Sequence, residues 1–280
     1  MNTGDPIVSS EWLAERLDEP DVKVVDASWY LPAMERDADA EYQEAHIPGA
    51  VRFDIDRIAD TSSGLPHTLA KPEAFARAVG RLGISETDTI VVYDGMGLFS
   101  APRVWWNFRV MGAANTFVLD GGLPAWRAAG KPTESGVVSP ASATFQPAFD
   151  ESAIRTIDDV QKAEGSTIVD ARPYGRFTGE DPEPREGMRS GHIPGSRSLP
   201  FTEVQRDGRL LTAGELAKLF ERSGVPSDKP ITTTCGSGVT AATIILARHR
   251  LGQTADTLYD GSWSEWGARS DVPVDTGPLQ

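Results

Sequence analysis

Three short segments from the first half of the chain recur in its second half, in the same order. The pairs are VVDAS and IVDAR at residues 24–28 and 168–172, AHIPGA and GHIPGS at 45–50 and 191–196, and VLDGGLPAW and LYDGSWSEW at 118–126 and 258–266. Matching residues stay between 140 and 146 positions apart. This separation is too long for a solenoid unit, so the chain is predicted to contain two homologous domains of roughly 130 residues each.

Both halves alternate short apolar segments with amphipathic ones. In the second half, strands are predicted at 166–172, 230–235 and 254–260, and helices at 213–224 and 237–252. Strands that alternate with helices are typical of α/β proteins. Each domain is therefore expected to hold a mostly parallel sheet with helices on both faces.

The boundary between the two domains is predicted from composition. Residues 136–150 are rich in Ser, Ala and Pro and contain no helix signal, which is typical of a linker. A first domain is therefore expected over 1–135 and a second over 151–280.

The composition limits the classes of partner. The formal net charge is −14. Nucleic acids and anionic membranes both attract basic surfaces, so neither is expected as a partner. The first twenty residues lack a basic segment followed by an apolar one, and no stretch approaches about eighteen consecutive apolar residues. We therefore expect a cytoplasmic protein without a membrane anchor.

Cys235 is the only cysteine, and it opens the loop CGSGVT between a strand-like and a helix-like segment. A loop of this kind points successive backbone N–H groups into one concavity, and glycine permits the curl. These amides and the helix N-terminus favour a thiolate, so we predict that Cys235 is a nucleophile. The alternative is a small cysteine buried in the core. The loop residues expected to line the substrate site are Gly236, Gly238, Val239 and Thr240.

The two domains differ at this position. The first domain keeps the strand, loop and helix but has Asp94 at or near the place of Cys235. The second domain is therefore predicted to be catalytic, and the first to support it or cover its site.

The segment CGSGVTA, the two HIPG segments and DGSWSEW together resemble the two-domain rhodanese-type sulfurtransferases, and most of all the 3-mercaptopyruvate sulfurtransferases. The resemblance extends over essentially the whole chain. It implies two tandem rhodanese-like domains, and sulfur transfer from 3-mercaptopyruvate through a Cys235 persulfide to a thiol or another nucleophile, with release of pyruvate. Thiosulfate-preferring relatives typically have basic residues after the cysteine, where this sequence has Gly236 and Ser237.

The same resemblance implies a proton relay. A serine at the place of Ser237 works in these enzymes with a histidine and an aspartate, which His67 and Asp56 match here. This is the general pattern of a hydroxyl oriented by a base and a carboxylate. The alternatives are a solvent-exposed loop histidine at His67 and a hydroxyl at Ser237 that only caps the following helix.

Arg176 and Arg185 lie nine positions apart in a segment rich in Gly and Pro. Arginine can hold a carboxylate through two parallel hydrogen bonds, and the resemblance implies that both residues bind the substrate carboxylate. The alternative is a pair of solvated arginines that balance the nearby acidic residues Glu180, Asp181, Glu183 and Glu186.

His46 and His192 occur in both HIPG segments, with and without a thiol in the repeat, so a structural role in a turn is expected for each. One cysteine and four scattered histidines do not match zinc-ligand spacing, so neither a metal nor another cofactor is expected. A cysteine phosphatase is excluded, because Ala241 stands where its loop needs an arginine.

Three other functions remain as alternatives. The first is a thiosulfate:cyanide sulfurtransferase (rhodanese) with the same persulfide. The second is a sulfur carrier that hands its persulfide to a protein thiol, such as that of thioredoxin. The third is a purely structural duplicate domain. The expected partners are therefore a small-molecule sulfur donor, 3-mercaptopyruvate or thiosulfate, and a thiol acceptor.

Overall fold

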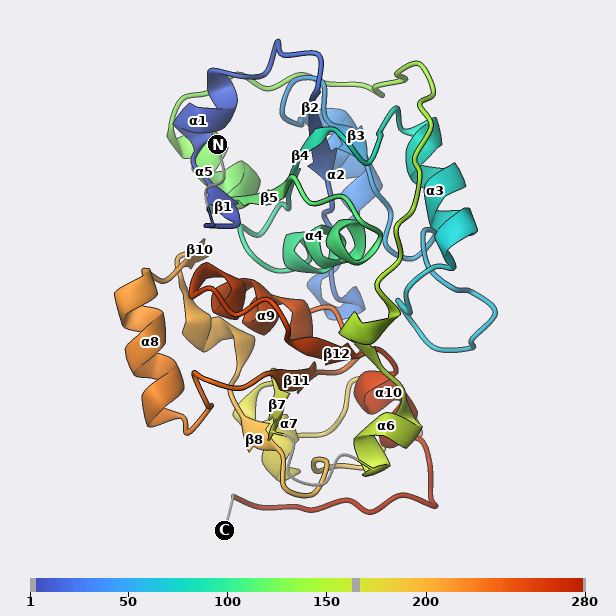
Figure 1. The fold of residues 1–280 in the computed structure, drawn as a ribbon, viewed down its shortest axis with the longest axis vertical. Coiled ribbons are helices and arrows are strands. Elements are labelled where there is room, and N and C mark those ends of the chain that lie inside the picture. The colour runs from blue at the N-terminus through green and yellow to red at the C-terminus, as the bar shows by residue number, and fades with distance from the viewer. Residues whose placement is uncertain (1–3, 163–166, 279–280) are drawn as a thin grey trace. The chain divides into compact units, whose positions relative to one another are not determined.

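The computed structural model describes residues 4–162 and 167–278. The chain forms two compact units (Figure 1). The first unit contains the residues up to 60 together with 69–150 and 207–210, and the second contains 61–68, 151–206 and the residues from 211 onward.

A five-stranded sheet with parallel neighbours forms the centre of the first unit, in the order β1-β5-β4-β2-β3. Its strands are β1 (Ile7–Val8), β2 (Val22–Asp26), β3 (Val51–Arg52), β4 (Thr89–Tyr93) and β5 (Thr116–Leu119). Its helices are α1 (Ser10–Ala14), η1 (Pro32–Met34), α2 (Ala38–Glu44), α3 (Pro72–Arg81), α4 (Ala101–Val110) and α5 (Gly122–Ala128), and the short strand β10 (Arg209–Leu210) also belongs to this unit.

The second unit repeats this topology, with a parallel sheet in the order β6-β12-β11-β7-β8. Its strands are β6 (Ile154–Arg155), β7 (Thr167–Asp170), β8 (Arg197–Ser198), β11 (Ile231–Thr234) and β12 (Thr257–Tyr259), with the short β9 (Gln205–Arg206) apart from the sheet. Its helices are η2 (Glu151–Ala153), α6 (Ile157–Lys162), α7 (Tyr174–Thr178), η3 (Phe201–Val204), α8 (Ala213–Arg222), α9 (Ala241–Arg250) and α10 (Ser262–Trp266).

Helices cover both faces of the second sheet, with α9 on one side and α6 and α10 on the other (Figure 1). Ile157 and Val160 of α6 form one buried apolar cluster with Trp263 and Trp266 of α10. The predicted α/β class, with parallel sheets and helices on both faces, is thereby confirmed for this unit.

The central strands β4 and β11 are rich in β-branched residues, which suit a strand covered on both faces. All four residues of β11 are buried, as are four of the five residues of β4. Helix α8 begins at a capping box, in which Thr212 and Glu215 satisfy each other's backbone N–H groups. Helix α9 begins at Ala241, four residues later than the predicted 237, because the intervening residues form the loop after Cys235.

Residues 136–150, the expected linker, contain no helix or strand, and most of them are exposed. An isolated bridge between His46 and Glu134 lies just before this segment. Phe145 is an exception, because its ring packs against Phe75 at 5.6 Å and against Phe108 in the core of the first unit. This segment therefore contributes to the first unit's core as well as connecting the domains.

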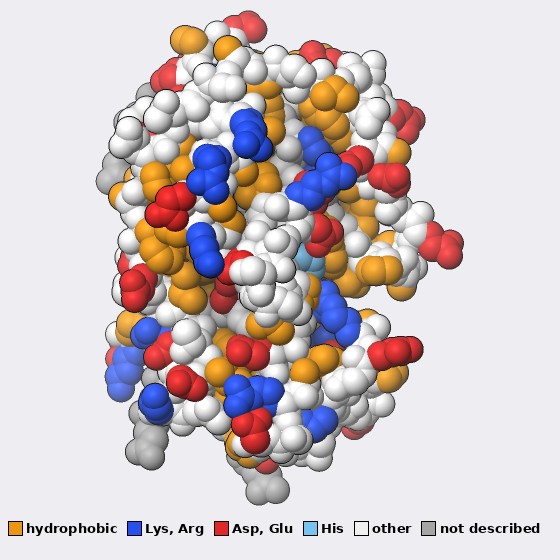
Figure 2. Space-filling model, turned by 90° about the vertical axis from the view of Figure 1, so that its right-hand side faces the viewer, with side chains coloured by type: hydrophobic (Ala, Val, Ile, Leu, Met, Phe, Trp, Pro, Cys, Tyr) orange, Lys and Arg blue, Asp and Glu red, His pale blue; other side chains and the backbone are white. Residues whose placement is uncertain are grey.

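Acidic and basic side chains are interspersed with apolar ones on the face shown in Figure 2. Despite the net charge of −14, this face of the protein therefore also presents Lys and Arg side chains. No helix in the part of the chain that the structure describes is long and apolar enough to cross a membrane.

Candidate active site

Cys235 follows directly after β11, at the carboxyl edge of the second parallel sheet, where ligands of α/β proteins usually bind. Its side chain is buried, with 2% of the residue exposed. Helix α10 holds its backbone: the N–H of Cys235 donates to Oγ of Ser262 at 3.3 Å, and the N–H of Trp263 donates to the carbonyl of Cys235 at 2.9 Å. The nucleophile candidate is thus fixed from a neighbouring helix as well as from its own strand.

The loop after Cys235 curls tightly before α9 begins. Gly238 has φ +79°, a left-handed conformation that favours glycine. Val239 is buried with Gly238, whereas Gly236 and Thr240 are partly exposed. The predicted loop of Gly236, Gly238, Val239 and Thr240 is therefore present beside the thiol.

Arg176 and Arg185 both reach this loop. A methyl group built on Gly236 would lie 3.2 Å from Nη2 of Arg176 and 4.0 Å from Nη1 of Arg185. The two guanidinium groups therefore approach the residue next to Cys235. Neither arginine is fully exposed, although Arg176 does pair with Glu183, one of the acidic residues named in the alternative. That the two arginines bind a substrate carboxylate stays a prediction.

The two arginines have different supports. Arg176 donates through Nε to Oε1 of Glu183 at 3.2 Å and pairs through Nη2 with Oε2 of the same carboxylate. Nη1 of Arg185 lies 3.4 Å from Oγ of Ser264, whose hydroxyl donates to the carbonyl of Gly236 at 2.6 Å.

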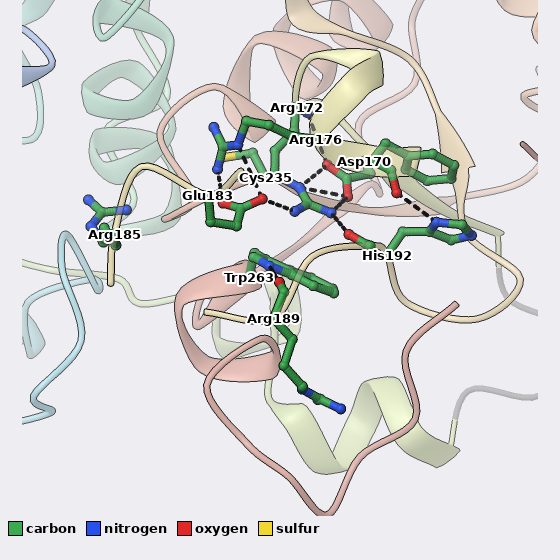
Figure 3. Close-up of polar contacts among 12 residues, drawn as sticks. Asp170, Arg172, Arg176, Glu183, Arg185, Arg189, His192, Cys235 and Trp263 are labelled. Carbon is green, nitrogen blue, oxygen red and sulfur yellow. Dashed lines mark hydrogen bonds and ion pairs between the residues drawn. The ribbon is translucent and has the colours of Figure 1, made fainter. Parts of the chain in front are cut away.

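The burial of Glu183 was not predicted from the sequence, where Glu183 was named only among the acidic residues that solvated arginines would balance. Its side chain is 4% exposed and lies between Arg176 and Arg172 (Figure 3). Arg172 is fully buried and also pairs with Asp170, the last residue of β7. Burial opposes the charged form of Arg172, but Asp170 and Glu183 outweigh it and raise the pKa of Arg172.

The repeat contained a signal for this ion-pair cluster, because the first unit has Ser28 where the second has Arg172.

Ser237 and His67 lie in contact within the second unit, although they are 170 positions apart in the chain. Nδ1 of His67 is 2.9 Å from Oγ of Ser237. Both residues are buried, at 5% and 6% exposed, so His67 is not a solvent-exposed loop histidine. His67 also has φ +61°, a conformation that is uncommon for a residue other than glycine.

Asp56 belongs to the first unit, where its Oδ2 accepts a hydrogen bond from Nε1 of Trp29 at 3.0 Å. Its predicted partnership with His67 would join residues of different units and stays a prediction.

The loop of the first unit closes around its own carboxylate. Asp94 follows β4 as Cys235 follows β11, and its Oδ2 accepts hydrogen bonds from the N–H groups of Phe99, Ser100 and Ala101 at 2.8–2.9 Å. Its Oδ1 accepts another from the N–H of Met96 at 2.8 Å. The backbone of the first unit's loop therefore converges on one anionic group. The same convergence in the loop that carries the thiol stays a prediction.

His46 and His192 make matching contacts in the two units. Nδ1 of His46 donates to the carbonyl of Tyr42 at 2.7 Å, and Nδ1 of His192 donates to the carbonyl of Phe177 at 2.8 Å. Both rings are buried. These equivalent contacts agree with the structural role expected from their presence in both repeats.

Among residues 4–162 and 167–278, no three His, Cys, Asp or Glu side chains are placed so that they could hold a metal ion together.

The chain is similar to known proteins over most of its length. The rhodanese-like domain family matches residues 9–129 and 154–269. The 3-mercaptopyruvate sulfurtransferase of Escherichia coli strain K12 is 45% identical over 272 residues, which cover 96% of this chain and 97% of that protein. Thiosulfate/3-mercaptopyruvate sulfurtransferase 1 of Arabidopsis thaliana, a mitochondrial protein, is 46% identical over 301 residues, which cover 99% of this chain and 79% of that protein.

The fold matches as well. The crystal structure of SseA, a 3-mercaptopyruvate sulfurtransferase from Escherichia coli, superposes with a TM-score of 0.85 at 42% identity, covering 93% of this chain and 100% of that one. Two matched domains, near full-length identity above 40% and a shared fold establish the relationship independently of the site. The chain therefore belongs to the family of sulfurtransferases built from two rhodanese-like domains, which includes the 3-mercaptopyruvate sulfurtransferases.

Proposed function

We propose that this protein is a sulfurtransferase that takes sulfur from 3-mercaptopyruvate, holds it as a persulfide on Cys235 and passes it to a thiol. The observation that supports this most is the approach of two guanidinium groups to Gly236, the residue beside the buried thiol. A carboxylate bound there would bring the remainder of a small α-keto acid to the sulfur of Cys235.

The first half-reaction transfers one sulfur atom. The thiolate of Cys235 attacks the sulfur of 3-mercaptopyruvate, an S–S bond forms, and the C–S bond breaks with its electron pair moving to carbon. The products are the Cys235 persulfide and the enolate of pyruvate, which takes up a proton to give pyruvate. In the second half-reaction an acceptor thiolate attacks the outer sulfur and Cys235 leaves as a thiolate. Covalent catalysis in two halves of this kind gives ping-pong kinetics.

Ser237 and His67 are proposed to move the proton between the donor thiol and the enolate. Their 2.9 Å contact supports this role, because a proton can pass along a hydrogen bond of that length. Asp56 is proposed as the carboxylate that orients His67, an assignment that rests on the family resemblance.

The loop backbone is proposed to stabilise the negative charge on the outer sulfur. Four N–H groups of the first unit's loop converge on Asp94, which supports a similar convergence of the amides of Gly238, Val239 and Thr240 on the persulfide.

Intact mass measured after brief exposure to each donor tests the proposal. We expect 3-mercaptopyruvate to add about 32 Da, the mass of one sulfur atom, to Cys235, with an equal amount of pyruvate, and a reducing agent to reverse the gain. Cys235→Ser is the control and should gain no mass. A wild-type protein that releases pyruvate without gaining sulfur would refute the persulfide.

Thiosulfate is the second candidate donor, and the donor named for the Arabidopsis relative supports testing it. We expect it to charge Cys235 more slowly, because its dianion needs more cationic charge than the loop residues Gly236 and Ser237 provide. Faster charging with thiosulfate would make the rhodanese reaction the principal one.

The proposed function also includes a sulfur acceptor and a cellular location. A thiol protein such as thioredoxin is the expected acceptor, and faster turnover with it than with a small thiol would support that partner. The relatives include a mitochondrial protein and one from a bacterium. Cytoplasmic location stays a prediction, tested by cell fractionation.

A further inference from the structure

The side chain of Glu183 is almost completely buried between two arginines of the second unit. Its contacts with Arg176 involve Nε and Nη2, which form one edge of the planar guanidinium. The side chain of Arg176 is 18% exposed, whereas that of Glu183 is 4% exposed. The carboxylate therefore covers the inner edge of Arg176, while the outer end of the same guanidinium reaches Gly236.

A chain of ion pairs connects Glu183 to the sheet. Nη1 of Arg172 lies 2.7 Å from Oε1 of Glu183, and Nε and Nη2 of Arg172 contact both carboxylate oxygens of Asp170 at 2.6–3.1 Å. Asp170 ends β7 and pairs in register with Thr234, the residue before Cys235. The thiol and the guanidinium of Arg176 are thus held from neighbouring strands.

Aromatic packing fixes the middle of this chain. The guanidinium of Arg172 lies 4.2 Å from the ring centroid of Trp263 and also donates to the carbonyl of Gly191 at 2.8 Å. Figure 3 shows Arg172 between Asp170 and Glu183, with Arg176 next to Cys235. Buried ion pairs of this kind keep a single arrangement, because each charge lacks access to water.

The first unit differs from the second at its corresponding strand. Asp26, the counterpart of Asp170, is followed by Ser28 where the second unit has Arg172. The hydrogen bond to Asp26 at that place comes from the N–H of Ser28.

Among the described residues, the first unit has a pair that uses the same atoms, Nε and Nη2 of Arg36 with the carboxylate of Glu41, but those side chains are 36% and 37% exposed. The glutamate that is buried and connected to the sheet through a second arginine lies in the unit that has the thiol, which favours a role in its chemistry over a general role in the fold.

We propose that Glu183 is a positioning residue that holds Arg176 by its Nε–Nη2 edge, so that the outer Nη1–Nη2 end faces the donor carboxylate beside Cys235. The proposal rests on the proposed function and specifies how its substrate site is ordered. An arginine fixed in this way loses little side-chain entropy when it binds a carboxylate. Glu183 acts through Arg176 and does not itself contact the donor.

The substitution Glu183→Gln removes the charge and keeps the size of the side chain. We expect KM for 3-mercaptopyruvate to rise about tenfold with little change in kcat, because a carboxylate contact of this kind acts on the bound ground state and transition state alike. Glu186→Gln removes a charge from an exposed position in the same segment and should leave KM unchanged.

Dependence on Arg176 separates positioning from a general structural effect. In an Arg176→Ala background, Glu183→Gln should raise KM no further, because the group through which Glu183 acts is gone. A second tenfold rise in that background would overturn the proposal. If Glu183→Gln does not fold, Glu183→Asp retains the charge on a shorter side chain and should show a smaller rise in KM with the same dependence on Arg176.

Alkylation of Cys235 provides a measurement that does not require sulfur transfer. The thiolate displaces iodide from the CH2 carbon of iodoacetate or iodoacetamide and gains a carboxymethyl or a carbamoylmethyl group, respectively, but only iodoacetate has a carboxylate. We expect Cys235 to prefer iodoacetate, and Glu183→Gln to lower the ratio of the two rates by about three- to tenfold relative to Glu186→Gln.

The outcomes distinguish the two proposals. An unchanged alkylation ratio in Glu183→Gln would overturn the role of Glu183 even if the wild type transfers sulfur. A wild type that forms no persulfide, yet loses its iodoacetate preference on substitution of Glu183, would refute the sulfurtransferase function while leaving Glu183 as an organiser of a carboxylate site.

Discussion

Asp94 and Cys235 occupy the same place in the two units, directly after the central strand of each sheet. A carboxylate in this place supplies an acceptor for the converging amides, so the loop is stable without a ligand. A thiol accepts hydrogen bonds only weakly, so Cys235 does not bind converging amides as strongly as a carboxylate does. The residue after the central strand is therefore one of the features that distinguish the loop closed on its own carboxylate from the loop that carries the thiol.

Removal of this carboxylate should destabilise the first unit. Asp94→Ala leaves four N–H groups without their acceptor, and we expect the free energy of unfolding to fall by about 2–4 kcal/mol. Asp94→Asn retains one carbonyl oxygen and should cost less. Urea unfolding followed by a tryptophan signal measures both, and an unchanged midpoint for Asp94→Ala would contradict this account.

Asp26 and Asp170 hold equivalent positions but should respond oppositely to the same substitution. Burial is the largest influence on Asp26 and raises its pKa, although Ser28 and the charge of Arg52 act in the opposite direction. Asp170 instead pairs with the buried Arg172. We expect Asp26→Asn to stabilise the protein at pH 7.5, and Asp170→Asn to destabilise it by about 3–5 kcal/mol because it leaves Arg172 without this partner.

The effect of Asp26 depends on pH with a defined sign. Its pKa is higher in the folded than in the unfolded state, so the wild type loses stability as the pH rises through the folded-state value. The advantage of Asp26→Asn should therefore be largest at neutral pH and disappear near about pH 3, below the ordinary pKa of aspartate. Unfolding curves across this range test the sign, and an advantage that grows toward acid pH would reverse it.

Arg185 should matter more for a carboxylate donor than for thiosulfate. Its guanidinium approaches Gly236 and is supported by the hydroxyl of Ser264. We expect Arg185→Ala to raise KM for 3-mercaptopyruvate about tenfold or more, and to raise KM for thiosulfate less. Steady-state kinetics with both donors measure the difference, and equal increases would mean that Arg185 does not recognise the carboxylate.

At the scale of elements, helix α10 supports the Cys235 loop through backbone contacts to Cys235 and Gly236. Its first residue, Ser262, has φ +49°, and the matching residue of the first unit is Gly122 with φ +54°. Glycine adopts this conformation without strain, whereas serine does so at a cost of about 1 kcal/mol. The hydroxyl of Ser262 offsets this cost by accepting from the N–H of Cys235 and donating to the carbonyl of Tyr259.

Two substitutions of Ser262 distinguish the contribution of its hydroxyl to stability from the cost of its backbone strain. Ser262→Ala removes both hydrogen bonds and keeps the strained backbone, so we expect a loss of about 1–2 kcal/mol of stability. Ser262→Gly removes the same bonds but relieves the strain, so its loss should be smaller. Thermal unfolding compares the pair, and a greater loss for glycine than for alanine would show that backbone strain is not the deciding factor.

At the scale of the whole molecule, two units with the same strand order have diverged around equivalent loops. The unit with the thiol also has the buried ion pairs of Arg172, and the other unit has a loop already occupied by its own carboxylate. The two units thus share one fold, but their equivalent loops carry different residues, a carboxylate in one and a thiol in the other.

Amide hydrogen exchange should differ between the loop of the first unit and the loop of the second. Conversion of Cys235 to a persulfide should slow amide exchange at residues 236–240, because the outer sulfur gives these N–H groups an anionic partner. Exchange at residues 95–101 should not change, since Asp94 already occupies that loop. Equal protection of both loops would contradict the assignment of chemistry to one unit.

The chain's sequence alone determined the two-domain α/β architecture, the predicted helices and strands of the second unit, and the loop that presents Cys235. These features follow from patterns that are local, such as β-branched runs, helical periodicity and glycine-containing loops, and from a repeat that is visible by direct comparison. The start of α9 was predicted too early, because Gly238 takes a left-handed conformation and the loop continues to the N-cap residue Thr240.

Only the tertiary structure decided which charged and polar side chains meet. Glu183 pairs with Arg176 rather than with water, His67 contacts Ser237 across 170 positions, and residues 61–68 join the second unit. Such contacts depend on how long loops fold and on which side chains lose water, and neither property is encoded in a short window of sequence. A buried ion pair forms where two charges are desolvated together, and that place exists only once the chain has packed.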